Sequence, residues 1–170
     1  MRPSPATTVR QNEAMTFEGR VAAIYVAPAE GKPMEERGEV QALAGVGLEG
    51  DRYALLAGKF SRPADLSKQA VTLIEREAIE AAREEYGVEL DEAETRRNLV
   101  TEGVPVNHLV GKEFTVGGIR MRGDELAEPC TYLESLTRDG VRLALIHRGG
   151  LRAEILDDGP IRVGDAVLPA

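Results

Sequence analysis

Apolar residues occur along this chain in short runs, most of them too short for an amphipathic helix. Residues 21–27 form such a run, with small and β-branched side chains, and it ends at Pro28. Residues 40–48, interrupted by two glycines, and residues 69–74 have the same character. Short apolar runs of this kind are typical of buried strands, so the sequence predicts a strand at each place.

Residues 75–86 follow the period of a helix instead, because their apolar side chains fall on one face. Gly87 comes next and is a suitable C-terminal stop for this helix. Turns or short helical pieces are expected at residues 91–94, 106–110 and 131–136. Residues 141–146 fit a short helix and a strand equally well, because so short a run does not reveal its period.

The C-terminal part of the chain again favours strands. Residues 114–116 and 119–121 alternate between apolar and polar side chains on either side of Gly117-Gly118, which predicts a β-hairpin. Further strands are predicted at residues 153–156, 161–163 and 166–168. The pattern as a whole predicts a β-rich α+β fold with few helices.

Two segments show no period. Residues 1–16 are polar and contain two prolines, so we expect a flexible N-terminal leader ahead of a single domain at residues 17–170. Residues 54–68 have a mixed composition and form a loop that is long enough to be functional or mobile.

The charge balance of the chain argues against several kinds of partner. The formal net charge is −8 and the pI is about 4.9, so we expect no binding to nucleic acid or to an anionic membrane. No apolar run is long enough to span a bilayer, and no apolar segment near the N-terminus resembles a secretory signal. We therefore expect a cytoplasmic protein, which could bind a small anion where arginines gather.

Cys130 is the only cysteine, and there are two histidines, which excludes an internal disulfide and a cysteine-rich zinc site. If Pro129 opens a helix, Cys130 lies beside free backbone N–H groups. That position favours the thiolate, the form that attacks electrophiles and binds soft metals. The alternative is a small buried hydrophobe. Nearby acidic residues oppose the thiolate if they face the sulfur: Asp124, Glu125, Glu128 and Glu134.

Arginines stand at three turns of this acidic chain. Arg96 and Arg97 precede Asn98 at the start of an apolar run, and their planar guanidinium groups suit phosphate or carboxylate oxygens. The alternative is a pair of solvated or ion-paired arginines. Arg148 stands before two glycines and could aim its guanidinium group into a site.

A glycine turn at residues 47–52 reads Gly-Leu-Glu-Gly-Asp-Arg. Two glycines three apart allow a close backbone approach, and the turn would display Asp51 and Arg52. An ordinary turn with a solvated ion pair is the alternative. The spacing matches no nucleotide-binding motif.

The order of these segments is more specific than any of them alone. They are residues 47–52, residues 69–74 (Gln-Ala-Val-Thr-Leu-Ile), residues 96–103 (Arg-Arg-Asn-Leu-Val-Thr-Glu-Gly), residues 128–130 (Glu-Pro-Cys), residues 148–153 (Arg-Gly-Gly-Leu-Arg-Ala) and residues 161–165 (Ile-Arg-Val-Gly-Asp). Together they closely resemble the MOSC domain, named for the C-terminal domain of molybdenum cofactor sulfurase. The likeness covers residues 17–168 and is greatest to the stand-alone bacterial members.

The resemblance implies a closed MOSC-type β-barrel, similar to the pyruvate kinase β-barrel, with a few flanking helices. It places the family's invariant cysteine at Cys130, which in relatives carries sulfur as a persulfide or ligates molybdenum. It also implies that Arg96, Arg97 and Asn98 grip the phosphate or pterin of the cofactor. Arg148 and the turn with Asp51 and Arg52 are expected to line the same pocket.

One position departs from the family pattern. Many relatives have a second cysteine three residues before the invariant one, and here that residue is Ala127. An internal disulfide or a relay between two sulfurs is therefore excluded. The cysteine desulfurase domain of the sulfurase is also not expected in a chain of 170 residues.

Three functions are compatible with this resemblance. The first is reduction of N-hydroxylated compounds by molybdenum cofactor bound through Cys130, with electrons from a flavin or iron–sulfur protein. The second is a sulfur carrier that forms a persulfide on Cys130, loaded by a cysteine desulfurase that brings its own pyridoxal phosphate. The third is a non-catalytic module that binds or delivers the cofactor.

Overall fold

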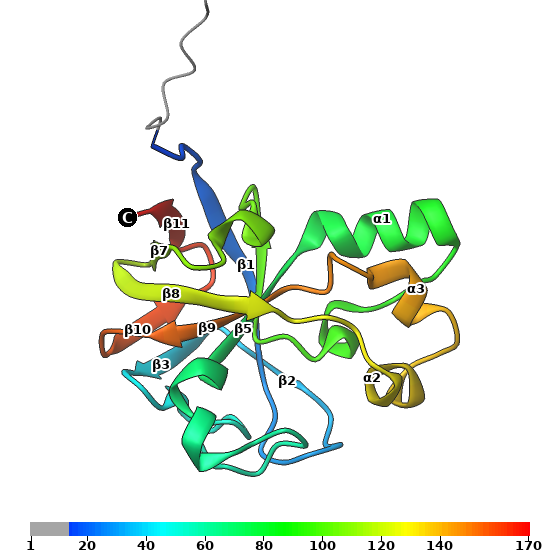
Figure 1. The fold of residues 1–170 in the computed structure, drawn as a ribbon, viewed down its shortest axis with the longest axis horizontal. Helices are drawn as coiled ribbons and strands as arrows, with labels where there is room; N and C mark the ends of the chain where they lie inside the picture. The colour runs from blue at the N-terminus through cyan, green and yellow to red at the C-terminus, as the bar shows by residue number, and fades with distance from the viewer. Residues whose placement is uncertain (1–13) are drawn as a thin grey trace, which may run out of the picture.

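A closed β-barrel forms the centre of the computed structural model, which describes residues 14–170 (Figure 1). Its strands are β1 (Gly19–Val26), β5 (Val71–Glu75), β6 (Leu99–Glu102), β7 (Glu113–Val116), β8 (Ile119–Leu126), β9 (Leu151–Ile155) and β11 (Ala166–Pro169). The order around the ring is β11, β7, β8, β9, β5, β6 and β1, and pairing of β1 with β11 closes it. Only β5 and β6 are parallel. The predicted β-rich barrel is therefore confirmed.

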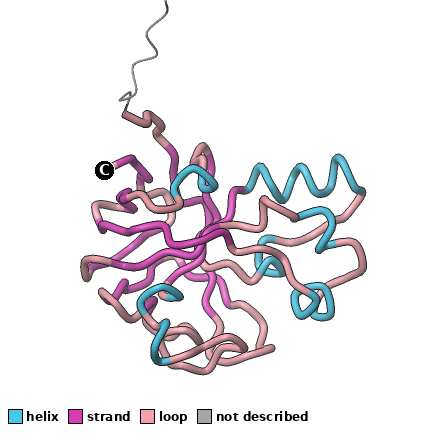
Figure 2. The backbone as a smooth tube through the Cα atoms, in the orientation of Figure 1, coloured by secondary structure: helices cyan, strands magenta, loops and turns pink. Residues whose placement is uncertain are grey.

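The remaining strands lie outside the ring. β2 (Glu35–Arg37) pairs with β1, whereas β3 (Glu39–Leu43), β4 (Gly47–Leu48) and β10 (Gly159–Arg162) form a separate small sheet. The helices are α1 (Arg76–Tyr86), α2 (Thr131–Leu136) and α3 (Val141–Leu145), with 3₁₀ turns η1 (Pro63–Asp65), η2 (Ser67–Gln69), η3 (Glu92–Thr95) and η4 (Val106–Leu109). The three α-helices gather on one side of the barrel (Figures 1 and 2). No helix within residues 14–170 is long and apolar enough to cross a membrane.

Two apolar cores result from this arrangement, and β1, β5 and β6 lie between them. Successive side chains of a strand point to opposite faces. Leu73 therefore points into the barrel core with Phe114 and Met121, while Ile74 joins a second core between the barrel and the helices. The apolar face of α1 packs into this second core, which explains its helical period.

Most sequence-predicted elements are present within one or two residues of their expected bounds. α1 ends at Gly87, whose φ of 65° is left-handed, and the hairpin turns at Gly117 and Gly118. The ambiguous segment at residues 141–146 is a helix. Residues 1–13 of the predicted leader lie outside the described residues, and Met15 packs against the barrel core beside Phe17.

Candidate functional site

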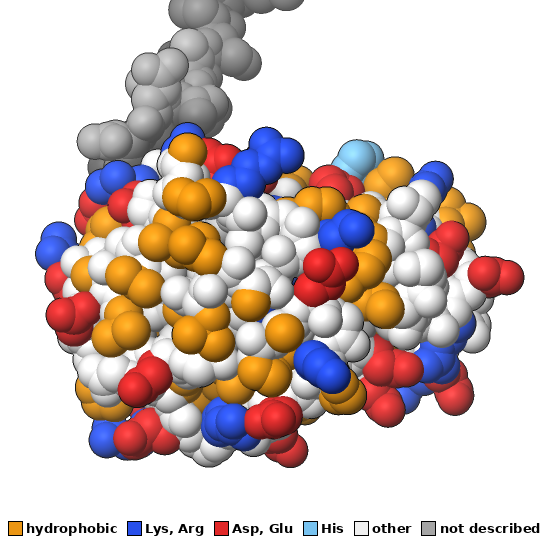
Figure 3. Space-filling model, turned by 90° about the horizontal axis from the view of Figure 1, so that it is seen from below, with side chains coloured by type: hydrophobic (Ala, Val, Ile, Leu, Met, Phe, Trp, Pro, Cys, Tyr) orange, Lys and Arg blue, Asp and Glu red, His pale blue; other side chains and the backbone are white. Residues whose placement is uncertain are grey.

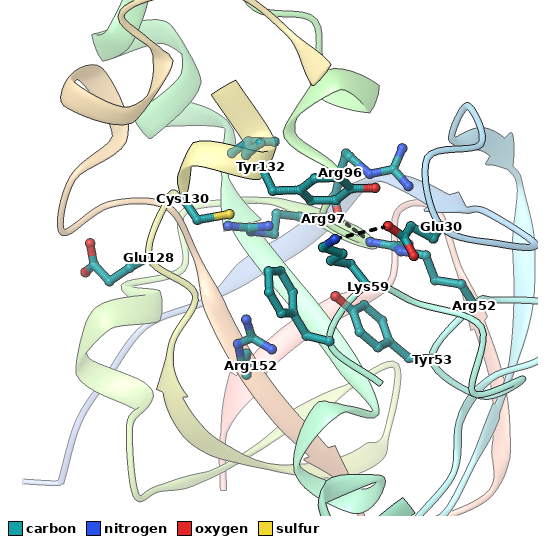
Figure 4. A pocket seen from close by; sticks show the side chains of 12 residues that line it. Glu30, Arg52, Tyr53, Lys59, Arg96, Arg97, Glu128, Cys130, Tyr132 and Arg152 are labelled. Atoms are coloured by element: carbon teal, nitrogen blue, oxygen red, sulfur yellow. Dashed lines mark hydrogen bonds and ion pairs between the residues drawn. The ribbon is translucent and has the colours of Figure 1, made fainter. Parts of the chain in front are cut away.

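One hollow near the end of the barrel brings Cys130 together with several of the predicted arginines (Figure 4). It is lined by Glu30, Arg52, Tyr53, Lys59, Phe60, Arg96, Arg97, Glu128, Cys130, Tyr132, Leu133 and Arg152. These residues come mainly from the turn and loop after β4, the segment before β6, and the segment that joins β8 to α2. Five of them are cationic and two are acidic. The hollow is therefore net positive in a chain of net charge −8, and it suits an anion.

Arg97 lies against the backbone on both sides of the Cys130 segment. Its Nε donates a hydrogen bond to the carbonyl of Gly149 at 2.7 Å, and its Nη2 donates to the carbonyl of Ala127 at 2.8 Å. Its Nη1 has no hydrogen-bond partner within residues 14–170, and the side chain lines the hollow. Burial lowers the pKa of Arg97 to about 10, which means that the site holds a poorly solvated positive charge.

Two glycines make this position of Arg97 possible. A Cβ on Gly149 would stand 2.5 Å from the carbonyl oxygen of Ala127, and one on Gly150 would stand 2.2 Å from that of Leu73. Gly150 also has a φ of 112°, which side chains rarely allow. The Arg-Gly-Gly sequence at residues 148–150 therefore lets β9 begin in direct contact with the segment that carries Cys130.

Arg96 stands beside Arg97 and holds the left-handed φ of 59° that ends η3. Its Nη1 donates to the carbonyl of Lys32 at 2.7 Å, and its own carbonyl accepts a hydrogen bond from Arg52. Burial and the nearby charge of Arg52 lower the pKa of Arg96. Arg52 is paired with the carboxylate of Asp51 at 3.2 Å. Within residues 14–170, neither Arg96 nor Arg97 has a carboxylate partner.

Cys130 is a free, partly exposed thiol at the residue before α2. Its backbone is extended, and Pro129 lies outside the helix, so the condition that Pro129 opens the helix is not met, although Cys130 does stand at the helix start as its N-cap. A helix of six residues has few peptide dipoles to align, so positive charge near the sulfur comes mainly from guanidinium groups. Figure 4 shows the sulfur directed toward Arg97.

Of the four acidic residues near Cys130 in sequence, one lines the hollow, namely Glu128. Its carboxylate accepts a hydrogen bond from the backbone N–H of His147 at 2.9 Å, and Figure 4 shows it on the far side of Cys130 from the arginines. The carboxylate of Glu134 accepts from the backbone N–H of Arg142 instead. The carboxylates of Glu128 and Glu134 are therefore both engaged by backbone N–H groups.

Three residues expected in the pocket lie outside it. Asp51 is buried, and its carboxylate accepts hydrogen bonds from the backbone N–H groups of Ala27 and Tyr53. Asn98 is also buried, and its amide joins β5, β6 and β1 through Thr72 and Tyr25. Both residues therefore hold the backbone next to the hollow in place and do not line the hollow themselves.

Arg148 points away from the hollow. It donates to the carbonyl of Ala144 at 2.8 Å, pairs with Glu85 at 2.9 Å, and lies over the ring of Tyr86. It is a guanidinium group that the fold already satisfies.

Aromatic side chains form a wall of the hollow that the sequence did not reveal. They are Tyr53, Phe60 and Tyr132. Phe60 and Tyr132 meet edge to face with ring centroids 6.2 Å apart, and Arg52 lies 4.6 Å from the ring centre of Tyr53. Tyr132 is two residues from Cys130, but Phe60 comes from the loop without a period, where no pattern distinguishes one side chain from another.

Comparisons with known proteins give the family and the fold. The MOSC domain model matches residues 61–168. The YUAD protein from Bacillus subtilis is 13% identical with a TM-score of 0.72, over 92% of this chain and 97% of that chain. YiiM from Geobacillus stearothermophilus is 16% identical with a TM-score of 0.64, over 89% and 75% of the two chains. YiiM from Escherichia coli is 18% identical with a TM-score of 0.60, over 92% and 70%. No curated protein matches significantly.

Proposed function

Because this chain belongs to the MOSC domain family, which is associated with molybdenum cofactor, we propose that it binds this cofactor through Cys130 and reduces N-hydroxylated compounds. One observation carries the proposal. The sulfur of Cys130, the only cysteine, lies in the same hollow as Arg96 and Arg97, and neither arginine has a carboxylate partner within residues 14–170. A soft metal ligand and a binding site for an anion are thereby side by side.

The donor set of the hollow fits the cofactor. A cysteine thiolate is a soft ligand suited to molybdenum, and guanidinium groups match the oxygens of a phosphate. The described residues contain no group of three or more His, Cys, Asp or Glu side chains that could hold a metal ion by themselves, so Cys130 would bind molybdenum together with the cofactor. The volume of the hollow, about 40 Å³, is too small for the cofactor, so part of its wall has to move.

The residues of the hollow would divide the work among themselves. Cys130 would hold the metal, and the free Nη1 of Arg97 and the partly buried Arg96 would hold the phosphate or pterin oxygens. Arg97 would also position Cys130, because its Nε and Nη2 fix the carbonyls of Gly149 and Ala127. The bound cofactor supplies the redox chemistry. Electrons would come from a separate flavin or iron–sulfur protein, since the chain has no cysteine set for a cluster.

A second candidate is sulfur transfer, favoured by the exposure of a free thiol in a cationic hollow. Cys130 would accept sulfur as a persulfide from a cysteine desulfurase, which would use its own pyridoxal phosphate. Mass spectrometry of the protein after incubation with desulfurase and cysteine tests this directly. A mass gain of one sulfur on Cys130 is expected, and its absence would rule the carrier out.

A third candidate, a non-catalytic binding module, predicts cofactor retention without turnover.

The proposed function is tested by metal analysis of protein made in cells that produce the cofactor. We expect stoichiometric molybdenum in the wild type and none in Cys130→Ser. Arg148→Ala is the matched control, since it removes a guanidinium group outside the hollow and should retain the metal. Wild-type protein without molybdenum would end the reductase proposal. Equal metal in wild type and Cys130→Ser would remove Cys130 as the ligand.

A further inference from the structure

The hollow over Cys130 is closed on one side by the loop that follows β4. Lys59 lies near the tip of this loop and faces Tyr132 of α2, two residues beyond Cys130 (Figure 4). Phe60 is the next residue of the loop and also contacts Tyr132. The ammonium nitrogen of Lys59 is 5.3 Å from the ring centre of Tyr132, and the ring of Phe60 meets Tyr132 edge to face. Segments more than 70 residues apart in the sequence thus touch across the mouth of the site.

The space behind these contacts is small. The hollow has a volume of about 40 Å³, enough for a few water molecules. Sites that hold a drug-sized molecule or a cofactor measure roughly 300–1,000 Å³. A molecule much larger than water therefore does not fit into the hollow beside the sulfur unless the loop and α2 separate.

The contacts between the loop and its neighbours at the mouth of the hollow are individually weak. Lys59 also pairs with Glu30 at 3.6 Å, but both side chains are about half exposed, where ion pairs contribute little. Leu55 and Leu56 of the same loop are 57% and 44% exposed. The loop lies at the lower edge of the molecule in Figure 1, and Figure 3 shows that face with apolar side chains spread across it. The backbone of the tip is held by one exposed hydrogen bond, from the side-chain amide of Gln69 to the carbonyl of Phe60 at 2.9 Å, and such exposed contacts open at low cost.

The base of the loop, by contrast, is fixed by backbone hydrogen bonds. Ala57 donates to the carbonyl of Arg52 at 2.7 Å and accepts from Glu30 at 2.8 Å. Gly58 donates to the hydroxyl of Ser61 at 2.9 Å, which keeps the turn at the tip intact. The tip can thus move as a unit about a base that stays in place.

We propose that Lys59, Phe60 and Tyr132 form a gate that selects by size which molecules reach the sulfur of Cys130. When the gate is closed, only molecules comparable to water enter. When Lys59 and Phe60 leave Tyr132, the hollow opens toward the guanidinium groups of Arg52, Arg96 and Arg97. The gate rests on the proposed function in one respect, since a cofactor is the large molecule that it would admit.

Because Cys130 is the only cysteine, alkylation of the cofactor-free full-length chain reports access to the hollow without ambiguity. Rates are measured with a small reagent, iodoacetamide, and a large one, fluorescein maleimide. Each rate is divided by the rate of the same reagent on the chain unfolded in urea. In the wild type we expect the large reagent to be excluded about tenfold more than the small one, an effect on the scale of one aromatic contact.

Phe60→Ala should remove most of this discrimination by raising the rate of the large reagent about tenfold. Lys59→Glu should raise it as well because it opposes Glu30, and adding Glu30→Lys should reverse the effect. Leu143→Ala is the control, since it removes an exposed apolar side chain of α3 outside the hollow. Equal exclusion of both reagents in the wild type, or no response to Phe60→Ala, would overturn the gate. Metal content is measured separately, so a failed gate and a failed cofactor site give different results.

Discussion

Two arginines at opposite ends of the parallel pair β5–β6 have opposite environments. Arg76 directly follows β5, pairs with Glu92 and Glu102, and has a pKa raised chiefly by the hydrogen bond to Glu92. Arg97 precedes β6, has backbone carbonyls as its partners, and has a pKa lowered by burial to about 10. A guanidinium group with carboxylate partners is satisfied within the fold. One without such partners gains from an anion that comes from outside.

The largest effect is expected from the glycine that lets Arg97 reach its position. Gly150→Ala would force a Cβ to within 2.2 Å of a backbone oxygen at a φ of 112°. We expect it to lower the free energy of unfolding by about 4 kcal/mol. Gly111→Ala is the control, because Gly111 has a φ of 75° with no atom near its missing Cβ, and it should cost about 1–2 kcal/mol. Equal losses in urea unfolding would contradict the steric explanation.

The same substitution at Arg97 and at Arg76 should have opposite effects on cofactor binding and on stability. Arg97→Met should weaken cofactor binding by about 1.5–3 kcal/mol, since it removes a charged hydrogen bond. Its effect on unfolding should stay within about 1 kcal/mol, because the loss of two hydrogen bonds is offset by the removal of a poorly solvated charge. Arg76→Met should behave in the opposite way, with unchanged cofactor binding and a loss of stability of about 2 kcal/mol.

Two measurements on each variant decide this prediction. Molybdenum retained during purification reports binding, and urea unfolding of the cofactor-free chain reports stability. If Arg97→Met keeps its metal, Arg97 has no direct part in binding. If both variants lose stability alike, the difference in their partners has no energetic meaning.

Most secondary-structure elements could be predicted from the sequence, but the closure of the barrel could not. Most strands, the glycine turns and the helix α1 follow local rules, and their predicted bounds agree with the structure within a residue or two. β2 was not predicted, and β8 continues to Leu126, beyond its predicted end. Closure of the barrel could not be derived from local rules, because it depends on β1 pairing with β11 at the other end of the chain. It was expected from the family resemblance alone.

The site residues were predicted from their chemical type, and the type of a residue does not show which other side chain it pairs with in the fold. Arg96, Arg97 and Arg148 look alike in the sequence, but Glu85 satisfies Arg148, while no carboxylate does so for the other two within the described residues. Phe60 could not be selected because a loop has no period that shows where its side chains point. Tertiary contacts decide both questions.

The smallest effect is expected at Tyr25, which lies next to Arg76, the arginine with carboxylate partners. Its hydroxyl donates to Glu92, the carboxylate that Arg76 also binds, and burial raises its pKa to about 12. Between pH 10 and 12, tyrosine in the unfolded chain loses its proton while folded Tyr25 keeps it. The folded state then binds more protons, so stability falls as the pH rises through this window. Below pH 10 both states keep the proton, and Tyr25 contributes no pH dependence.

Tyr25→Phe should therefore be less stable than the wild type at pH 9 by about 1 kcal/mol, the value of one hydrogen bond. The difference should shrink as the pH approaches 12, because the variant has no hydroxyl to titrate while the wild type loses stability. Urea unfolding of both proteins at several alkaline pH values measures this difference and cancels the titration of lysines common to both. A gap that stays constant with pH would show that neither burial nor Glu92 raises the pKa of Tyr25 in the folded state.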